Sequence, residues 1–130
     1  MDWNQCLKKR IAKEVSKDKS KSASFKEIID VKIRSAGVLP EDLYYAKIVL
    51  LYDALRTLLE ITALQEGYKI YNHECYTAFL KEILKMSKEG DLFDELRKVR
   101  NNINYYGMQL SHQEASEVIK QLKALILKFK

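Results

Sequence analysis

Apolar side chains recur every three or four residues along almost the whole chain, which is the spacing of amphipathic helices. Leu7, Ile11 and Val15 form one such stripe and predict a short helix that fades near residue 16. The same spacing, with its start and stop signals, predicts five further helices over residues 24–37, 40–66, 71–88, 91–107 and 111–129. Every segment is therefore predicted to be helical.

The starts of these helices carry capping signals. Two are capping boxes, in which a serine and a glutamate three residues later satisfy free backbone amides. These pairs are Ser24 with Glu27 and Ser111 with Glu114. Pro40 and Asp91 mark two further helix starts. Because the 40–66 segment is apolar on most sides, we expect it in the centre of the bundle.

The pattern predicts an all-α fold, an up-and-down bundle of four to five helices with an extra N-terminal basic helix. We place the basic helix or arm in residues 1–22 and the bundle in residues 23–130. A chain of 130 residues suits one hydrophobic core, and four glycines with one proline are too few for an all-β fold. No stretch approaches the roughly 18 apolar residues of a membrane span, so we expect no membrane partner.

The chain has two cysteines, Cys6 and Cys75. Two cysteines cannot by themselves form a disulfide framework or a zinc site, and the simplest interpretation is a pair of reduced thiols in a cytoplasmic protein. The N-terminus also lacks the apolar core of a secretory signal. Because there is no His-x-x-x-His pair and no CxxC motif, we expect no metal site and no cofactor.

The net charge of +5 is concentrated at the N-terminal end. Residues 1–34 carry ten basic against five acidic side chains, whereas residues 35–130 carry 13 of each. The excess basic residues are Lys8, Lys9, Arg10, Lys13, Lys17, Lys19 and Lys21. Such a segment binds phosphates without sequence preference, or is simply a solvated terminus.

Arg97, Arg100 and Asn104 share one flank of the 91–107 helix, beside its buried stripe and not on its outer face. Two arginines on one flank repel each other unless an anion lies between them. The anion is either a phosphate, which the guanidinium fork suits well, or a carboxylate of a neighbouring helix. His73 is a second candidate, because a histidine at the edge of an apolar face titrates near neutrality; a capping or core-edge role is equally open.

Three features, in their order and spacing, resemble the HEPN domain, a helical domain of prokaryotic toxins and RNA-processing proteins. They are the segment from Leu51 to Leu59 in a long helix that ends at Glu66-Gly67-Tyr68-Lys69, then His73, then Arg100-Asn101 ahead of an aromatic pair and Gly107. The resemblance covers roughly residues 24–129. It implies a homodimer with a cleft where the arginine motifs meet, and in many members a small nucleotidyltransferase partner within a toxin–antitoxin module.

Many HEPN proteins are metal-independent ribonucleases in which four to six intervening residues separate an arginine from a histidine, and this chain departs from that motif. Counted from Arg100, the histidine window holds Tyr105, Tyr106 and Gly107. We therefore expect a protein that binds RNA, a nucleotide or the partner nucleotidyltransferase without strong catalysis. The candidate ligand-binding residues are Lys69, Arg97, Arg100, Asn101 and Asn104.

Two alternatives stay open. The first is an active endoribonuclease in which Arg100 holds the phosphate and His73 or Tyr105 moves the proton. The second is a helical dimerisation or adaptor module, in which Arg97 and Arg100 pair with internal carboxylates.

Overall fold

The computed structural model describes residues 1–18, 20 and 22–130. Lys19 and Lys21 of the N-terminal basic segment lie outside the described residues. The elements are α1 (Trp3–Lys8), β1 (Ala12–Glu14), α2 (Ser22–Val38), α3 (Tyr44–Gln65), β2 (Tyr68–Ile70), α4 (His73–Ala78), the π-helical turn η1 (Phe79–Ile83), α5 (Ser87–Tyr106) and α6 (His112–Phe129). The prediction of an all-α helical bundle is confirmed.

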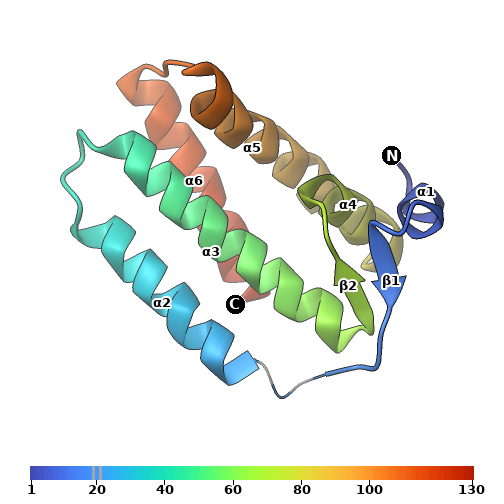
Figure 1. Ribbon diagram of the computed structural model, residues 1–130. Coiled ribbons are helices and arrows are strands. Elements are labelled where there is room, and N and C mark those ends of the chain that lie inside the picture. The colour runs from blue at the N-terminus through green and yellow to red at the C-terminus, as the bar shows by residue number, and fades with distance from the viewer. Residues whose placement is uncertain (19, 21) are drawn as a thin grey trace.

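Helix α3 forms the centre of the bundle, as its nearly continuous apolar surface predicts. Figure 1 shows α2 on one side of α3 and helices α5 and α6 on the other. The helix begins at Tyr44 and not at Pro40, because residues 40–43 form a turn closed by the Leu43 amide on the Pro40 carbonyl at 3.0 Å. Thr57 is buried within α3, and its hydroxyl donates a hydrogen bond to the Asp53 carbonyl at 2.9 Å.

The structure contains two short strands that the sequence analysis did not predict. Residues 12–14, predicted as helix, form β1, which pairs antiparallel with β2 in the register Ala12–Ile70, Lys13–Lys69 and Glu14–Tyr68. A strand of three residues is too short to show a period of two, so only its tertiary partner defines it. We call this pair of strands the β1–β2 ribbon.

The predicted 71–88 helix is divided. It consists of α4 and the π-helical turn η1. The Asn72 side chain caps α4 by accepting a hydrogen bond from the Glu74 amide at 2.8 Å. The chain then turns at Lys85, whose φ of 59° is left-handed. Helix α5 consequently begins at Ser87, a turn earlier than the predicted Asp91 cap. It ends where expected, at Gly107, whose φ of 61° suits a residue without a β-carbon.

Of the two predicted capping boxes, the one at Ser111 and Glu114 is confirmed, with reciprocal hydrogen bonds of 3.0 and 3.1 Å. The Ser24 prediction is wrong, because α2 begins at Ser22.

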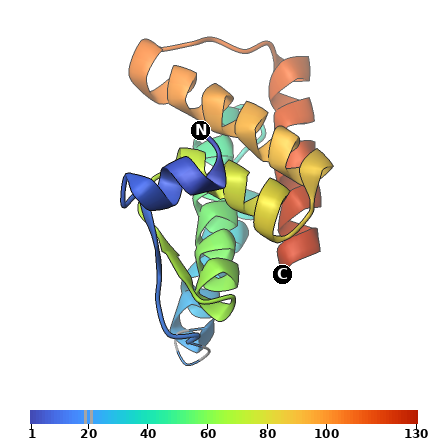
Figure 2. The ribbon, with the colours of Figure 1, turned by 90° about the vertical axis from the view of Figure 1, so that its right-hand side faces the viewer.

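The N-terminal segment packs into the core of the bundle. Trp3 is buried, and its ring makes an edge contact with Tyr68 at 5.1 Å between centroids and a tilted contact with Phe79 at 5.9 Å. Ala12 of β1 belongs to the same buried cluster. Figure 2 shows α1 lying across the outside of α4, next to the ribbon.

Cys6 of α1 and Cys75 of α4 form a disulfide, with their Cα atoms 6.1 Å apart. The prediction of reduced thiols is therefore wrong, and the cytoplasmic location that we expected from free thiols loses that support. The sequence could not predict this disulfide, because 69 residues separate the two cysteines and the packing of α1 on α4 brings them together. None of the helices in the described residues has the length and apolar character needed to cross a membrane.

Candidate anion-binding site

His73 and Arg100, which are 27 positions apart in the sequence, meet at the fully buried ring of Tyr52. The Tyr52 hydroxyl lies 3.0 Å from His73 Nδ1, and the Arg100 guanidinium carbon lies 5.4 Å from the centre of the Tyr52 ring. The ring itself stacks on Phe93 of α5, with 5.8 Å between centroids. Helices α3, α4 and α5 thus each contribute one polar side chain to the same point.

Arg97 and Arg56 extend this group. Both act electrostatically on Tyr52 and His73, as does the carboxylate of Asp53. We call the set the Arg–His cluster; its members are Tyr52, Asp53, Arg56, His73, Arg97 and Arg100. Asp94 pairs with Arg97 at 2.9 Å and Glu60 with Arg56 at 3.4 Å, whereas Asp53 lies 3.8 Å from Arg100, so Arg100 is the arginine whose charge is least compensated and that favours an anionic ligand most.

The two arginines predicted from the sequence differ in how far internal carboxylates satisfy them. Arg97 donates to the same oxygen of Asp94 through Nη2 at 2.9 Å and Nε at 3.2 Å. Among the residues that the structure describes, Arg100 has only a loose ion pair with Asp53, at 3.8 Å, and a long hydrogen bond to Asn101 at 3.4 Å. Arg97 is therefore largely committed to the fold, whereas Arg100 is not.

One nitrogen of Arg100 is unpaired among the described residues. This atom, Nε, is buried and makes no hydrogen bond there. A buried, unpaired donor on a charged group is unfavourable, and such groups in native proteins are usually satisfied by a ligand, water or ion. The side chain is 18% exposed, so its outer nitrogens are within reach of a ligand at the surface.

His73 is electrically neutral in this environment. Burial, followed by the positive fields of Arg56 and Arg100, lowers its pKa to about 4. Burial raises the pKa of Tyr52 well above its usual range, so this phenol keeps its proton.

The hydrogen bond between these two side chains fixes the tautomer of His73. The Tyr52 hydroxyl makes no other hydrogen bond in the described chain, and accepting from His73 would leave its own hydrogen buried and unpaired. Tyr52 therefore donates to Nδ1, and the ring hydrogen is on Nε2. In this state His73 offers a hydrogen bond from Nε2 and has no free nitrogen to accept a proton.

The other predicted site residues lie farther out. Lys69 is held by Glu60 at 2.8 Å, and Glu60 also pairs with Arg56 at 3.4 Å, so Lys69 joins the edge of the cluster through a shared carboxylate. Within the described chain, neither Asn104 nor Tyr105 has a hydrogen bond or ion pair to the cluster. Tyr105 is 71% exposed and lies on a different side of α5 from Arg100.

Sequence reasoning missed Tyr52, Asp53 and Arg56 as members of the site. A signal was present, since Tyr52 and Arg56 lie on one face of the central helix at a spacing of four, but a polar pair within an apolar segment does not indicate a site until its partners on α4 and α5 are known.

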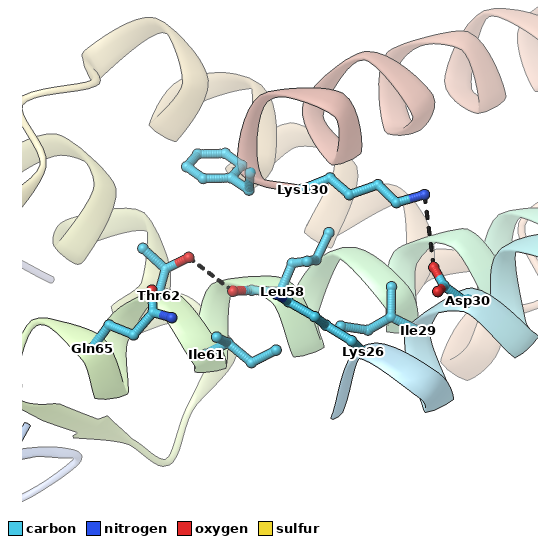
Figure 3. Close-up of a pocket in the computed structure, with 9 residues that line it drawn as sticks. Lys26, Ile29, Asp30, Leu58, Ile61, Thr62, Gln65 and Lys130 are labelled. Carbon is cyan, nitrogen blue, oxygen red and sulfur yellow. Dashed lines mark hydrogen bonds and ion pairs between the residues drawn. The ribbon is translucent and has the colours of Figure 1, made fainter. Parts of the chain in front are cut away.

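A cavity of about 450 Å³ lies elsewhere, between α2, α3 and the end of α6. Figure 3 shows its apolar floor, with Leu58 and Ile61, and the 3.7 Å ion pair between Lys130 and Asp30 at its edge. None of the predicted site residues lines this cavity. The described residues also contain no group of three or more histidine, cysteine or acidic side chains placed to hold a metal ion.

Comparison of the chain with protein-family models, with curated proteins and with solved structures found no significant match.

Proposed function

We propose that the Arg–His cluster binds a phosphate group of an RNA strand or a nucleotide and does not cleave it. The observation that carries this proposal is the incompletely paired guanidinium of Arg100, held against Tyr52 beside His73. A phosphate oxygen accepts hydrogen bonds from guanidinium and imidazole groups and compensates the loosely paired charge of Arg100. The resemblance to HEPN proteins, in which arginine holds the phosphate, supports the same proposal.

The tautomer of His73 favours binding over cleavage. A ribonuclease needs a group that removes the proton of the 2′-hydroxyl, and His73 with its hydrogen on Nε2 cannot accept one there. The nuclease alternative therefore predicts metal-independent RNA cleavage that depends on His73, whereas the binding proposal predicts intact RNA. Incubation of RNA with the protein in EDTA, followed by electrophoresis, separates the two.

The binding test compares Arg100→Ala with the matched variant Arg34→Ala, which removes the same charge from the exposed side of α2. We expect Arg100→Ala to weaken binding of a nucleotide and of single-stranded RNA at least tenfold, the effect of one charge-assisted hydrogen bond of about 1.5–3 kcal/mol. Arg34→Ala should change the affinity less than twofold. Equal losses in both variants would contradict a defined site.

The partners implied by the resemblance stay predictions. We propose a homodimer and a nucleotidyltransferase partner on the resemblance alone; light scattering of the purified protein and co-purification from the native cell test them. The adaptor alternative gains one observation, since Arg97 is paired with Asp94 as that reading predicts. It fails if Arg100→Ala selectively loses phosphate binding.

A further inference from the structure

The β1–β2 ribbon places an aromatic ring between two lysines on its outer face. Ala12 and Ile70 point into the core, so the alternating positions Lys13 and Lys69 point outward, directly opposite each other. Tyr71, two residues beyond Lys69, lies on the same face and is 57% exposed. Its ring centre is 5.7 Å from Lys13 Nζ and 5.9 Å from Lys69 Nζ.

This arrangement has a cost for the fold. Like charges directly opposite each other in an antiparallel pair destabilise it. Lys69 is compensated by Glu60 at 2.8 Å, but Lys13 forms no ion pair among the described residues. The cation–π contacts of the two lysines with the Tyr71 ring offset only part of this cost, at about 0.5–1 kcal/mol for an exposed contact. A half-exposed aromatic ring flanked by two cations matches the surface on which single-stranded nucleic acids stack their bases, with the cations meeting the adjoining phosphates.

The ribbon face is joined to the Arg–His cluster. Glu60 of α3 accepts from Lys69 of the ribbon and pairs with Arg56 of the cluster. In the sequence, Tyr71 precedes His73 by only two residues, with the helix cap Asn72 between them. The shared Glu60 and the two-residue separation of Tyr71 from His73 therefore connect the proposed phosphate site to the Tyr71 ring.

We propose that Tyr71, flanked by Lys13 and Lys69, is a base-stacking subsite for single-stranded RNA. This inference rests on the proposed function, because the cluster holds a phosphate while Tyr71 stacks an unpaired base of the same strand. It adds a requirement for a nucleobase, which phosphate binding alone does not have.

The experiment measures two probes. One is a fluorescein-labelled single-stranded oligouridylate of ten nucleotides, followed by anisotropy; the other is inorganic polyphosphate, which has no bases, followed by calorimetry. The variants are Tyr71→Ala, Tyr71→Phe, Arg100→Ala and, as a matched exposed tyrosine at the far end of α5, Tyr106→Ala. Thermal melting by circular dichroism checks that each variant is folded.

We expect Tyr71→Ala to weaken oligouridylate binding about tenfold or more, which corresponds to the stacking of one base. Tyr71→Phe, which retains the ring, and Tyr106→Ala should stay within twofold of the unaltered protein. Polyphosphate binding should be insensitive to Tyr71→Ala and weakened by Arg100→Ala.

The two proposals fail differently. If Arg100→Ala loses oligouridylate binding and Tyr71→Ala does not, the stacking subsite is wrong and the phosphate site stands. If the unaltered protein binds polyphosphate but no oligouridylate, the stacking subsite is again wrong. If neither probe binds, both proposals are wrong.

Discussion

His73 makes the stability of this protein depend on pH in a specific direction. Its pKa is about 4 in the folded chain and about 6.5 when unfolded, so the unfolded state binds the proton more tightly. The free energy of unfolding is therefore unaffected by the protonation of His73 above pH 6.5. It falls as the pH drops toward 4, by up to about 1.4 kcal/mol per pH unit, because the unfolded state takes up a proton that the folded state does not. Urea unfolding at pH 7.5 and 5 measures this loss, which His73→Gln should reduce.

Tyr52→Phe tests the hydrogen bond that fixes the His73 tautomer. Without the hydroxyl, Nδ1 loses its donor at 3.0 Å, and we expect about 1 kcal/mol of stability to be lost and the pKa of His73 to rise. Binding of a nucleotide should weaken, because Nε2 no longer carries the hydrogen in a fixed orientation. Two-dimensional NMR of the histidine ring follows both the pKa and the tautomer; an unchanged ring spectrum would contradict the assignment.

The sequence alone identified three of the six residues of the Arg–His cluster as site residues. Arg97, Arg100 and His73 were visible as polar residues beside apolar stripes, and two of them do meet. Tyr52 was not visible as a site residue, because a buried tyrosine inside a hydrophobic helix looks like core until its hydroxyl has a partner. Tyr105 was chosen by its distance from Arg100 along the chain, and its exposed position follows from the helical rotation between them.

Among the elements, the long helices were predictable and the short pieces were not. Helices α2, α3, α5 and α6 each contain several turns of periodic pattern, so their existence was evident and their starts were off by a turn at most. The β1–β2 ribbon, α4 and η1 span three to six residues each. Elements of that length are defined by contacts with distant segments, such as the pairing of Lys13 with Lys69.

The disulfide joins α1 to α4 and should stabilise the fold substantially. It closes a loop of 69 residues, for which the loss of chain entropy in the unfolded state corresponds to about 4 kcal/mol. We expect Cys75→Ser, or treatment with a phosphine reductant, to lower the free energy of unfolding by about 2–4 kcal/mol in urea titrations. Because Trp3 still packs on Phe79, the reduced protein should remain folded. Identical urea midpoints with and without reductant would contradict the bond.

For the molecule as a whole, the positive charge is part of a folded surface. Residues 3, 6 and 12 belong to the core, so the basic segment cannot be removed without damaging the fold. The exposed side chains of Lys8 and Lys9 can instead be neutralised in place. This separates long-range attraction of RNA from the contacts made at the Arg–His cluster.

We expect Lys8→Gln combined with Lys9→Gln to make RNA binding less sensitive to salt without removing it. Each phosphate contact with a single strand contributes about 0.7 to the slope of log affinity against log salt concentration, so the slope should fall by at most about 1.4. Anisotropy titrations of oligouridylate at several salt concentrations give this slope. Arg100→Ala should also lose affinity for polyphosphate at high salt, where attraction by distant charges is screened. If the double lysine variant instead lost all binding at low salt, the basic segment and not the cluster would be the binding site.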